Sequence, residues 1–248
     1  MTKADHLKRL STPRGIIAAM AVDQRKSLRI MIAAAAGVAL DAIGDEQLGE
    51  FKRTVVRKLS PYASAVLIDP EFGQPAIGEQ AAGCGLLLTY EMDGYENPRP
   101  NRMLAPMPEW SVRRLAEAGA NGIKILLSWN PFDAAEPNDA KRVWIERIGA
   151  ECHANGLPFF LEPVSYDPSG RLDPRSYEYA LQKPEIVIQT MREFSDRRYH
   201  VDVLKVEFPV NVTHLGTACS HEAALGFCRE ADAAAKGVPY IYLSAASC

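Results

Sequence analysis

The sequence predicts an α/β fold of the TIM (β/α)8-barrel type. Short apolar runs alternate with amphipathic segments of helical period, which is typical of βα units in a parallel sheet. Several runs are almost continuously aliphatic, as expected for parallel strands that helices cover on both faces. The length of 248 residues suits one barrel domain. No GxGxxG or Walker A motif is present, which argues against a nucleotide-binding doubly wound sheet.

The elements follow in order along the chain. The expected strands cover 15–22, 63–69, 85–90, 122–129, 157–164, 201–210 and 239–244. The expected helices cover 3–10, 30–40, 45–59, 108–118, 139–155, 183–199 and 220–236. Helix 45–59 carries apolar residues at helical spacing, namely Leu48, Phe51, Val55, Val56 and Leu59. Glycine follows three of the helices, as it commonly does at helix ends. The alanine-rich segment 30–40 is expected to be a packed helix.

The number of strands departs from a closed barrel. Seven strands are expected instead of eight, and the sequence stops shortly after the seventh. We therefore expect a single (β/α) barrel domain over residues 1–248, truncated after the seventh strand and lacking the eighth strand and the last helices. Segments 97–108 and 165–174 are expected to be long βα loops, which build the active-site face of such barrels.

Composition excludes several classes of partner. The net charge is −3, so no basic footprint for nucleic acid is present. No apolar run is long enough for a membrane span, and the first residues lack the apolar core of a signal peptide. The five cysteines form no CxxC pair. These observations predict a cytoplasmic protein without nucleic-acid or membrane partners.

The segment 201–210 carries the strongest chemical signal, because a lysine lies in the middle of an apolar strand. Lysine is rarely buried unless it is paired or functional. A desolvated neutral amine can attack a carbonyl group and form a Schiff base. Lys205 shares one strand face with Val203 and Glu207. The opposite face, expected to pack under the helices, carries Leu204, Val206 and Phe208.

Other charged residues lie on or directly after neighbouring strands. Lys124 lies on the fourth strand and Glu162 on the fifth, while Asp23 and Asp69 close the first two strands. Such residues are expected to point into one barrel mouth. An ion-pair network that only stabilises the barrel is the alternative, because buried charges must be paired. A metal site is not favoured, since the five histidines form no HxH or HExxH cluster. Only His214, after the sixth strand, is expected near the site.

In combination these motifs resemble the class I tagatose 1,6-bisphosphate aldolases of the LacD type, which are related to sulfofructose 1-phosphate aldolases. The matching pieces are Ala21-Val22-Asp23-Gln24-Arg25, Leu59-Ser60-Pro61-Tyr62-Ala63-Ser64, Glu109-Trp110-Ser111-Val112, Glu146-Arg147-Ile148-Gly149, Pro158-Phe159-Phe160-Leu161-Glu162, Val201-Asp202-Val203-Leu204-Lys205-Val206-Glu207 and Pro239-Tyr240-Ile241-Tyr242-Leu243-Ser244-Ala245. They run through almost the whole chain.

The resemblance implies a metal-independent aldol cleavage with no cofactor, in the catabolism of lactose and galactose. By resemblance, Lys205 is the Schiff-base lysine, Glu162 the general acid/base and Lys124 a second lysine of the site. Asp23 and Gln24 match positions that line the substrate site. Arg25 is a further candidate for phosphate binding, with a salt bridge as the alternative. Ser244 is also expected to bind the phosphorylated ketose.

Two departures from the family pattern leave alternatives open. This chain reads Leu243-Ser244-Ala245-Ala246 where the family usually has Leu-Ser-Ala-Gly, and the phosphate-binding eighth strand is absent. The alternatives are a sulfofructose 1-phosphate aldolase and a non-catalytic remnant that binds sugar phosphate. The Gly94-Tyr95 loop and Glu109-Trp110-Ser111 favour tagatose bisphosphate as the substrate. A homo-oligomer is possible, because an open barrel exposes strand edges.

Overall fold

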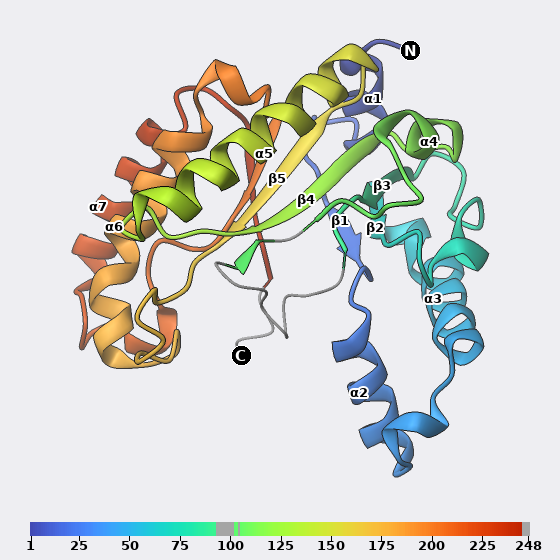
Figure 1. The fold of residues 1–248 in the computed structure, drawn as a ribbon, viewed down its shortest axis with the longest axis horizontal. Helices are drawn as coiled ribbons and strands as arrows, with labels where there is room; N and C mark the ends of the chain where they lie inside the picture. The colour runs from blue at the N-terminus through green and yellow to red at the C-terminus, as the bar shows by residue number, and fades with distance from the viewer. Residues whose placement is uncertain (93–101, 104, 245–248) are drawn as a thin grey trace. The chain divides into compact units, whose positions relative to one another are not determined.

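The computed structural model describes residues 1–92, 102–103 and 105–244, in which parallel strands alternate with helices (Figure 1). The strands are β1 (Ala19–Ala21), β2 (Ala65–Ile68), β3 (Gly85–Thr89), β4 (Gly122–Ser128), β5 (Phe159–Val164), β6 (Val203–Val206) and β7 (Tyr240–Tyr242). The helices are α1 (Lys3–Leu10), α2 (Lys26–Ala36), α3 (Asp45–Leu59), α4 (Val112–Glu117), α5 (Ala135–Ala154), α6 (Tyr177–Phe194) and α7 (His221–Ala234). The strand order is β1-β2-β3-β4-β5-β6-β7. Each expected strand contains an observed one, and the predicted alternation is confirmed.

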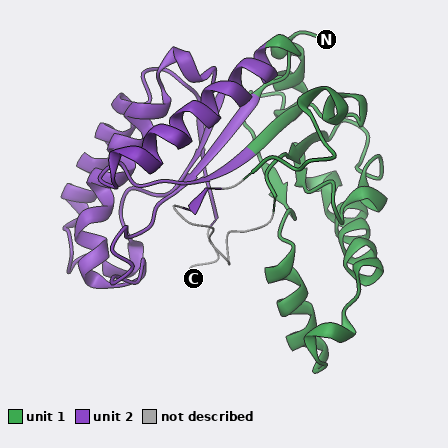
Figure 2. Cartoon of the chain, viewed as in Figure 1, with its two compact units in different colours: residues 1–96, 105–124, 154–158 green, residues 97–104, 125–153, 159–248 purple. Residues whose placement is uncertain are grey.

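The chain divides into two compact units (Figure 2). Unit 1 comprises Met1–Glu96, Ala105–Lys124 and Ala154–Pro158. Unit 2 comprises Asn97–Leu104, Ile125–His153 and Phe159–Cys248. The single barrel domain over 1–248, without an eighth strand, therefore stays a prediction. Of the expected loops, 165–174 does connect β5 to α6, and 97–108 lies partly outside the described residues. Gly94-Tyr95, Ala245-Ala246 and Cys248 also lie outside them.

Two strands of unit 1, β2 and β3, are buried on both faces. Every residue of β2 and β3 is buried, as expected for parallel strands covered by helices. Helix α1 begins with a capping box formed by Thr2 and Asp5 and ends against the start of β3. A Cβ atom at Gly85 would lie 2.8 Å from the carbonyl oxygen of Arg9. Glycine at this position therefore permits the close contact between α1 and β3.

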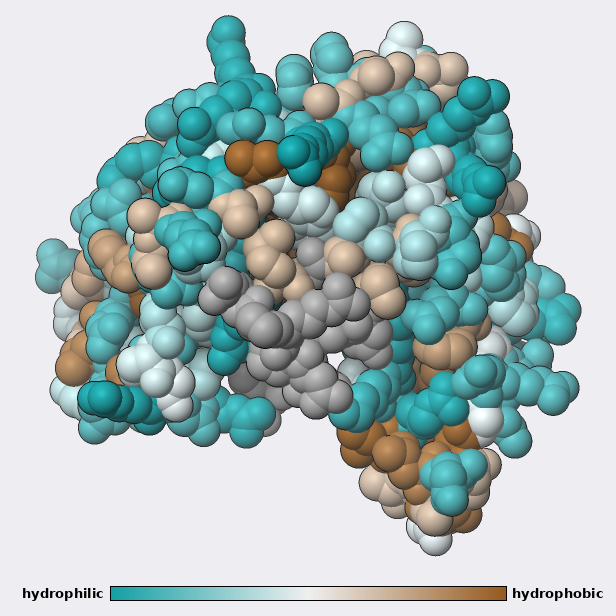
Figure 3. Space-filling model, in the orientation of Figure 1, coloured by the Kyte–Doolittle hydropathy of each residue, from teal (hydrophilic) through white to brown (hydrophobic). Residues whose placement is uncertain are grey.

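The expected packed helix at 30–40 is only partly correct. The observed helix α2 begins at Lys26 and ends at Ala36, and the capping residue Gly37 adopts the left-handed conformation at φ 66°. Only Leu28 and Ala33 are buried in it, whereas Ile30 and Met31 are exposed. The apolar surface of this segment is visible in Figure 3. The sequence pattern thus predicted a helix correctly but not the extent of its packing.

Helix α3 has the expected bounds but turns a different face to the core. Leu48 and Val56 are buried as expected, whereas Phe51 and Leu59 are 41% and 49% exposed. The remaining buried positions are Gly49 and Lys52. Positions 48, 52 and 56 are four residues apart and share one face of a helix. A lysine therefore lies at the centre of the buried stripe.

Unit 2 contains the rest of β4, strands β5 to β7 and helices that differ in detail from expectation. Helix α6 begins at Tyr177, after the N-cap Ser176, and contains Pro184 in its interior. The expected start at 183 was too late, because the capping serine was the decisive signal. Phe208 follows the end of β6 and is 41% exposed, so the prediction that it packs under the helices was wrong. No helix in the described part of the chain is long and apolar enough to cross a membrane.

Candidate active site

In unit 2, Lys205 and Glu162 form an ion pair across two neighbouring parallel strands. Strand β5 pairs with β6 in the register Phe160↔Val203 and Leu161↔Leu204, which aligns Glu162 with Lys205. Lys205 Nζ lies 2.7 Å from Glu162 Oε1, and the two side chains are 14% and 9% exposed. The sheet itself therefore holds an amine and a proton acceptor in direct contact. A nucleophilic lysine with a carboxylate in hydrogen-bond reach has the parts required for covalent catalysis with proton transfer.

The other carboxylate on this strand face has different partners. Glu207 lies two residues beyond Lys205, and its Oε1 is 3.2 Å from Lys183 Nζ on α6. Its second oxygen accepts a hydrogen bond of 2.7 Å from the backbone N–H of Ser165. Glu207 thus anchors α6 and the loop after β5. Of the two carboxylates, Glu162 is the one in contact with Lys205.

In unit 1, Lys124 lies between two carboxylates and is almost fully buried. Its Nζ is 3.0 Å from Asp23 Oδ2 and 2.9 Å from Glu91 Oε1. Lys124 is 2% exposed and Glu91 is 6% exposed. Burial raises the pKa of Glu91, and the neighbouring cations Lys124 and Arg25 only partly offset this effect. The second oxygen of Glu91 has no hydrogen-bond partner among the described residues, which is consistent with the cost of keeping this carboxylate ionised.

Arg25 is a buried member of the same cluster. Its Nη2 donates hydrogen bonds of 3.0 Å to Thr89 Oγ1 and 2.9 Å to the backbone carbonyl of Glu91. Its Nε lies 3.4 Å from Glu71 and 3.8 Å from Asp69. With an exposed fraction of only 5%, Arg25 is tied to the ends of β2 and β3. These contacts support the salt-bridge alternative for this residue.

The remaining predicted residues are less constrained. Gln24 is exposed, although its backbone carbonyl accepts a hydrogen bond from Lys52. Ser244 follows β7 and is exposed. His214 Nε2 lies 2.9 Å from the backbone oxygen of Arg175, which links this histidine to the segment before α6. The structure thus groups Lys205 with Glu162 in unit 2, and Lys124 with Asp23 and Arg25 in unit 1. The expectation that all these residues point into one barrel mouth stays a prediction.

Sequence reasoning missed three buried polar residues. Glu91 lies just beyond β3 and pairs with Lys124. Lys52 donates to the ends of β1 and β2 from the buried face of α3. Lys141 on α5 is fully buried and donates a hydrogen bond of 2.8 Å to Tyr166 Oη. For both lysines the available signal was a lysine at helical spacing from buried apolar residues.

Burial perturbs the titration of the Lys141 group. Desolvation lowers the pKa of Lys141 to about 8; the charge of Asp133 opposes this shift, and the cation of Arg102 adds to it. Tyr166 also donates a hydrogen bond to Asp133, and burial raises the pKa of its hydroxyl. The guanidinium of Arg102 lies over the Tyr166 ring, 4.4 Å from its centroid. The cluster connects the loops that follow β4 and β5.

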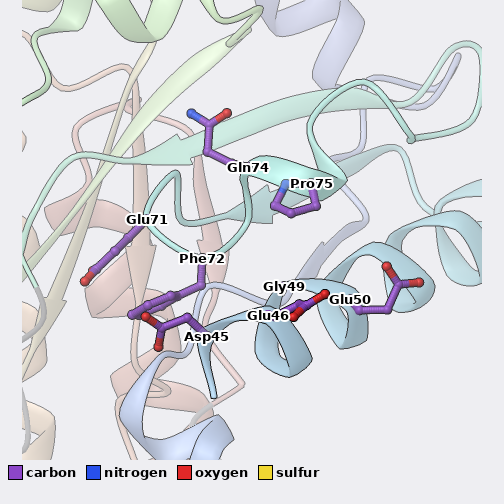
Figure 4. Close-up of a pocket in the computed structure, with 8 residues that line it drawn as sticks. All are labelled: Asp45, Glu46, Gly49, Glu50, Glu71, Phe72, Gln74 and Pro75. Atoms are coloured by element: carbon purple, nitrogen blue, oxygen red, sulfur yellow. The ribbon is translucent and has the colours of Figure 1, made fainter. Parts of the chain in front are cut away.

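One hollow of unit 1 shares Glu71 with the contacts of Arg25. It has a volume of about 740 Å³ and lies between α3 and the segment after β2 (Figure 4). Four carboxylates line it, from Asp45, Glu46, Glu50 and Glu71. An acidic lining repels a phosphorylated sugar. We therefore do not assign the substrate to this hollow. Within the described ranges, no group of three or more His, Cys, Asp or Glu residues is arranged to hold a metal ion.

Comparison with known proteins gives a consistent family. Residues 17–245 match the family described as DeoC/LacD family aldolase. The chain is 45% identical over 245 residues to tagatose 1,6-diphosphate aldolase 2 of Enterococcus faecalis, an alignment that covers 96% of this chain and 72% of the relative. It is 43% identical over 250 residues to tagatose 1,6-diphosphate aldolase of Listeria monocytogenes, covering 98% and 72% of the two chains.

Solved structures support the same fold at low sequence identity. The fructose-bisphosphate aldolase from Slackia heliotrinireducens aligns with a TM-score of 0.65 and 12% identity, covering 99% of this chain and 70% of that one. An archaeal fructose 1,6-bisphosphate aldolase aligns with a TM-score of 0.58 and 13% identity, covering 97% and 79%. At such identities the likeness concerns the fold alone. Together with the parallel strands in chain order, it confirms the predicted barrel-type α/β fold.

Proposed function

Because the chain belongs to the DeoC/LacD family of aldolases, we propose that it cleaves tagatose 1,6-bisphosphate through a Schiff base on Lys205. The products are dihydroxyacetone phosphate and glyceraldehyde 3-phosphate. The observation that carries the proposal is the contact of 2.7 Å between Lys205 Nζ and Glu162 Oε1. The choice of substrate rests on two relatives named tagatose 1,6-diphosphate aldolase, which are 45% and 43% identical to this chain.

The reaction begins at the amine of Lys205. The neutral amine attacks the C2 carbonyl of the open-chain ketose, and the carbinolamine loses water to give a protonated Schiff base. This iminium accepts the electron pair of the C3–C4 bond when that bond breaks, so the fragment C1–C3 becomes an enamine. Protonation of the enamine at C3 and hydrolysis of the iminium release dihydroxyacetone phosphate and restore the amine. Lys205 is thus the nucleophile and the source of the electron sink.

Glu162 supplies the proton transfers in this proposal. Its carboxylate takes the proton of the C4 hydroxyl while the C3–C4 bond breaks, which releases the aldehyde product. The same carboxyl group can return a proton later in the cycle. Its low exposure of 9% favours a site from which water is largely excluded. Its contact with the amine supports a base beside the carbon chain that becomes attached to Lys205.

The unit 1 cluster is assigned to substrate binding. We propose that Lys124 stabilises an anionic oxygen of the substrate and that Asp23 and Gln24 bind its hydroxyl groups. The support is the resemblance of this segment to the family and the burial of Lys124 between two acids. Arg25 and Ser244 are weaker candidates for phosphate contacts. Arg25 is engaged by Thr89 and two acidic side chains, and Ser244 is exposed.

Borohydride trapping tests the proposal directly. The protein is incubated with dihydroxyacetone phosphate, reduced with borohydride, digested and analysed by peptide mass spectrometry. We expect a reduced adduct on the peptide that contains Lys205, and its loss in Lys205→Met. The exposed Lys58 provides a control, because Lys58→Met should keep the adduct. An adduct on another lysine contradicts the role assigned to Lys205. The absence of any adduct on the folded protein favours a non-catalytic sugar-phosphate binder.

A substrate comparison then tests the specificity. Tagatose 1,6-bisphosphate, fructose 1,6-bisphosphate and sulfofructose 1-phosphate are compared by kcat/KM under identical conditions. We expect cleavage of tagatose 1,6-bisphosphate. Cleavage of the sulfonated ketose phosphate without activity on tagatose 1,6-bisphosphate would instead identify the alternative substrate.

A further inference from the structure

Lys52 is a charged residue that lies wholly inside unit 1. It belongs to the buried face of α3, and its side chain is 0% exposed. Its Nζ donates hydrogen bonds of 2.8 Å to the carbonyl oxygen of Val22 and 2.7 Å to that of Gln24. It also forms an ion pair with Asp69 Oδ1. All three protons of the ammonium group therefore have acceptors.

These contacts concern the segment in which Asp23, Gln24 and Arg25 lie. Strand β1 ends at Ala21, and α2 begins at Lys26, so the segment has no regular structure of its own. Val22 and Gln24 flank Asp23 in sequence. In an extended chain, residues two apart present their carbonyl groups on the same side, and one ammonium group can bind both. Lys52 thus fixes the backbone on either side of Asp23, whose carboxylate contacts Lys124.

Asp69 holds the ammonium group of Lys52 in place. The residue follows β2 directly and is 0% exposed. While Oδ1 binds Lys52, Oδ2 accepts a hydrogen bond of 2.7 Å from the backbone N–H of Phe72. Burial lowers the pKa of Lys52, and the attraction of Asp69 opposes this shift. The pair therefore links α3 to the ends of β1 and β2.

We propose that Lys52 is a positioning residue that sets the geometry of the segment Asp23–Arg25 for substrate binding, an inference that rests on the proposed function. With no exposed surface, Lys52 does not touch the substrate. It acts through two backbone carbonyl groups, and Asp69 orients it. Displacement of binding groups by about 1 Å can reduce a rate about 100-fold. A residue that does not touch the substrate can therefore still control activity.

The test compares Lys52→Met with Lys58→Met on the same helix. Lys58 is exposed, and its replacement is expected to leave kinetics unchanged. For Lys52→Met we expect kcat/KM for tagatose 1,6-bisphosphate to fall by about 100-fold. At saturating dihydroxyacetone phosphate, Lys205 should still form the borohydride-reduced adduct, because that lysine and Glu162 belong to unit 2. A folded Lys52→Met variant whose kcat/KM stays within about threefold of wild type overturns the proposal.

A second variant separates positioning from folding. Lys52→Met alone leaves Asp69 buried without its cation, which can prevent folding. The double variant Lys52→Met/Asp69→Asn removes both charges, while the asparagine oxygen can still accept the Phe72 N–H. We expect it to fold and to remain deficient in kcat/KM. If activity returns together with stability, Lys52 has only a structural role. If wild type is inactive in the same assay, the proposed function is wrong instead.

Discussion

Replacement of Glu162 by glutamine removes the proposed base with little change in shape. Glutamine has the length of glutamate, and its amide oxygen can still accept a hydrogen bond from Lys205 across the observed 2.7 Å. It cannot take up the proton of a substrate hydroxyl group. The change therefore isolates proton transfer from side-chain packing. Glu207→Gln is the matched control, because Glu207 directly follows β6, the strand of Lys205, and contacts Lys183 instead.

Glu162→Gln is expected to reduce the rate strongly and the stability only slightly. General acid–base catalysis contributes about 10²–10⁴ in rate, which equals roughly 2.7–5.5 kcal/mol in activation free energy. The hydrogen bond between Lys205 and residue 162 is weakened but not removed, at a cost of about 1 kcal/mol in unfolding free energy. With an unfolding entropy of about 2 cal/mol/K per residue, the 248 residues give about 0.5 kcal/mol/K. The Tm should then fall by only about 2 °C.

The assay follows glyceraldehyde 3-phosphate release and, separately, borohydride trapping of dihydroxyacetone phosphate on Lys205. We expect Glu162→Gln to lose at least about 100-fold in kcat while its adduct on Lys205 still forms. Glu207→Gln should lose less than about tenfold, as expected for a residue that does not handle the proton. If Glu162→Gln is folded and keeps more than about a tenth of the wild-type kcat, Glu162 is not the base.

Three further predictions concern stability. The unfolding free energy, measured in urea, should rise by up to about 1.4 kcal/mol per pH unit between about pH 8 and pH 10. The reason is that Lys141 loses its proton near pH 8 in the folded protein but only near 10.5 in the unfolded chain. Lys141→Met should flatten this rise, and an unchanged slope would contradict the assignment of the rise to Lys141. Gly149→Ala places a Cβ atom against the carbonyl oxygen of Tyr199 and should lower the unfolding free energy by about 3 kcal/mol. Gly226→Ala meets nothing within 4 Å and should stabilise α7 by up to about 1 kcal/mol. Equal Tm values for the two variants would refute the steric argument. Lys124→Met leaves Asp23 and Glu91 without their shared cation and should lower the unfolding free energy by about 3 kcal/mol at neutral pH. A chemical-denaturation midpoint equal to that of wild type would show that the two acids find other partners.

Local patterns in the sequence predicted the strands and helices of the fold and singled out Lys205 as the candidate nucleophile. The period of apolar residues predicted the seven strands, and it gave the bounds of α1 and α3 as observed. A lysine inside an apolar strand marked Lys205 before any contact was known. These features depend on neighbours in the chain, because side-chain direction follows the period of the element.

Only the tertiary structure decided which charged groups meet. The sequence placed both Glu162 and Glu207 near Lys205, and the register of β5 against β6 brings Glu162 into contact while Lys183 engages Glu207. The buried role of Lys52 also depended on the rotation of α3, since Phe51 of the same amphipathic pattern is exposed. Ion-pair partners come from segments distant in sequence, and their choice depends on packing and register that no local period specifies.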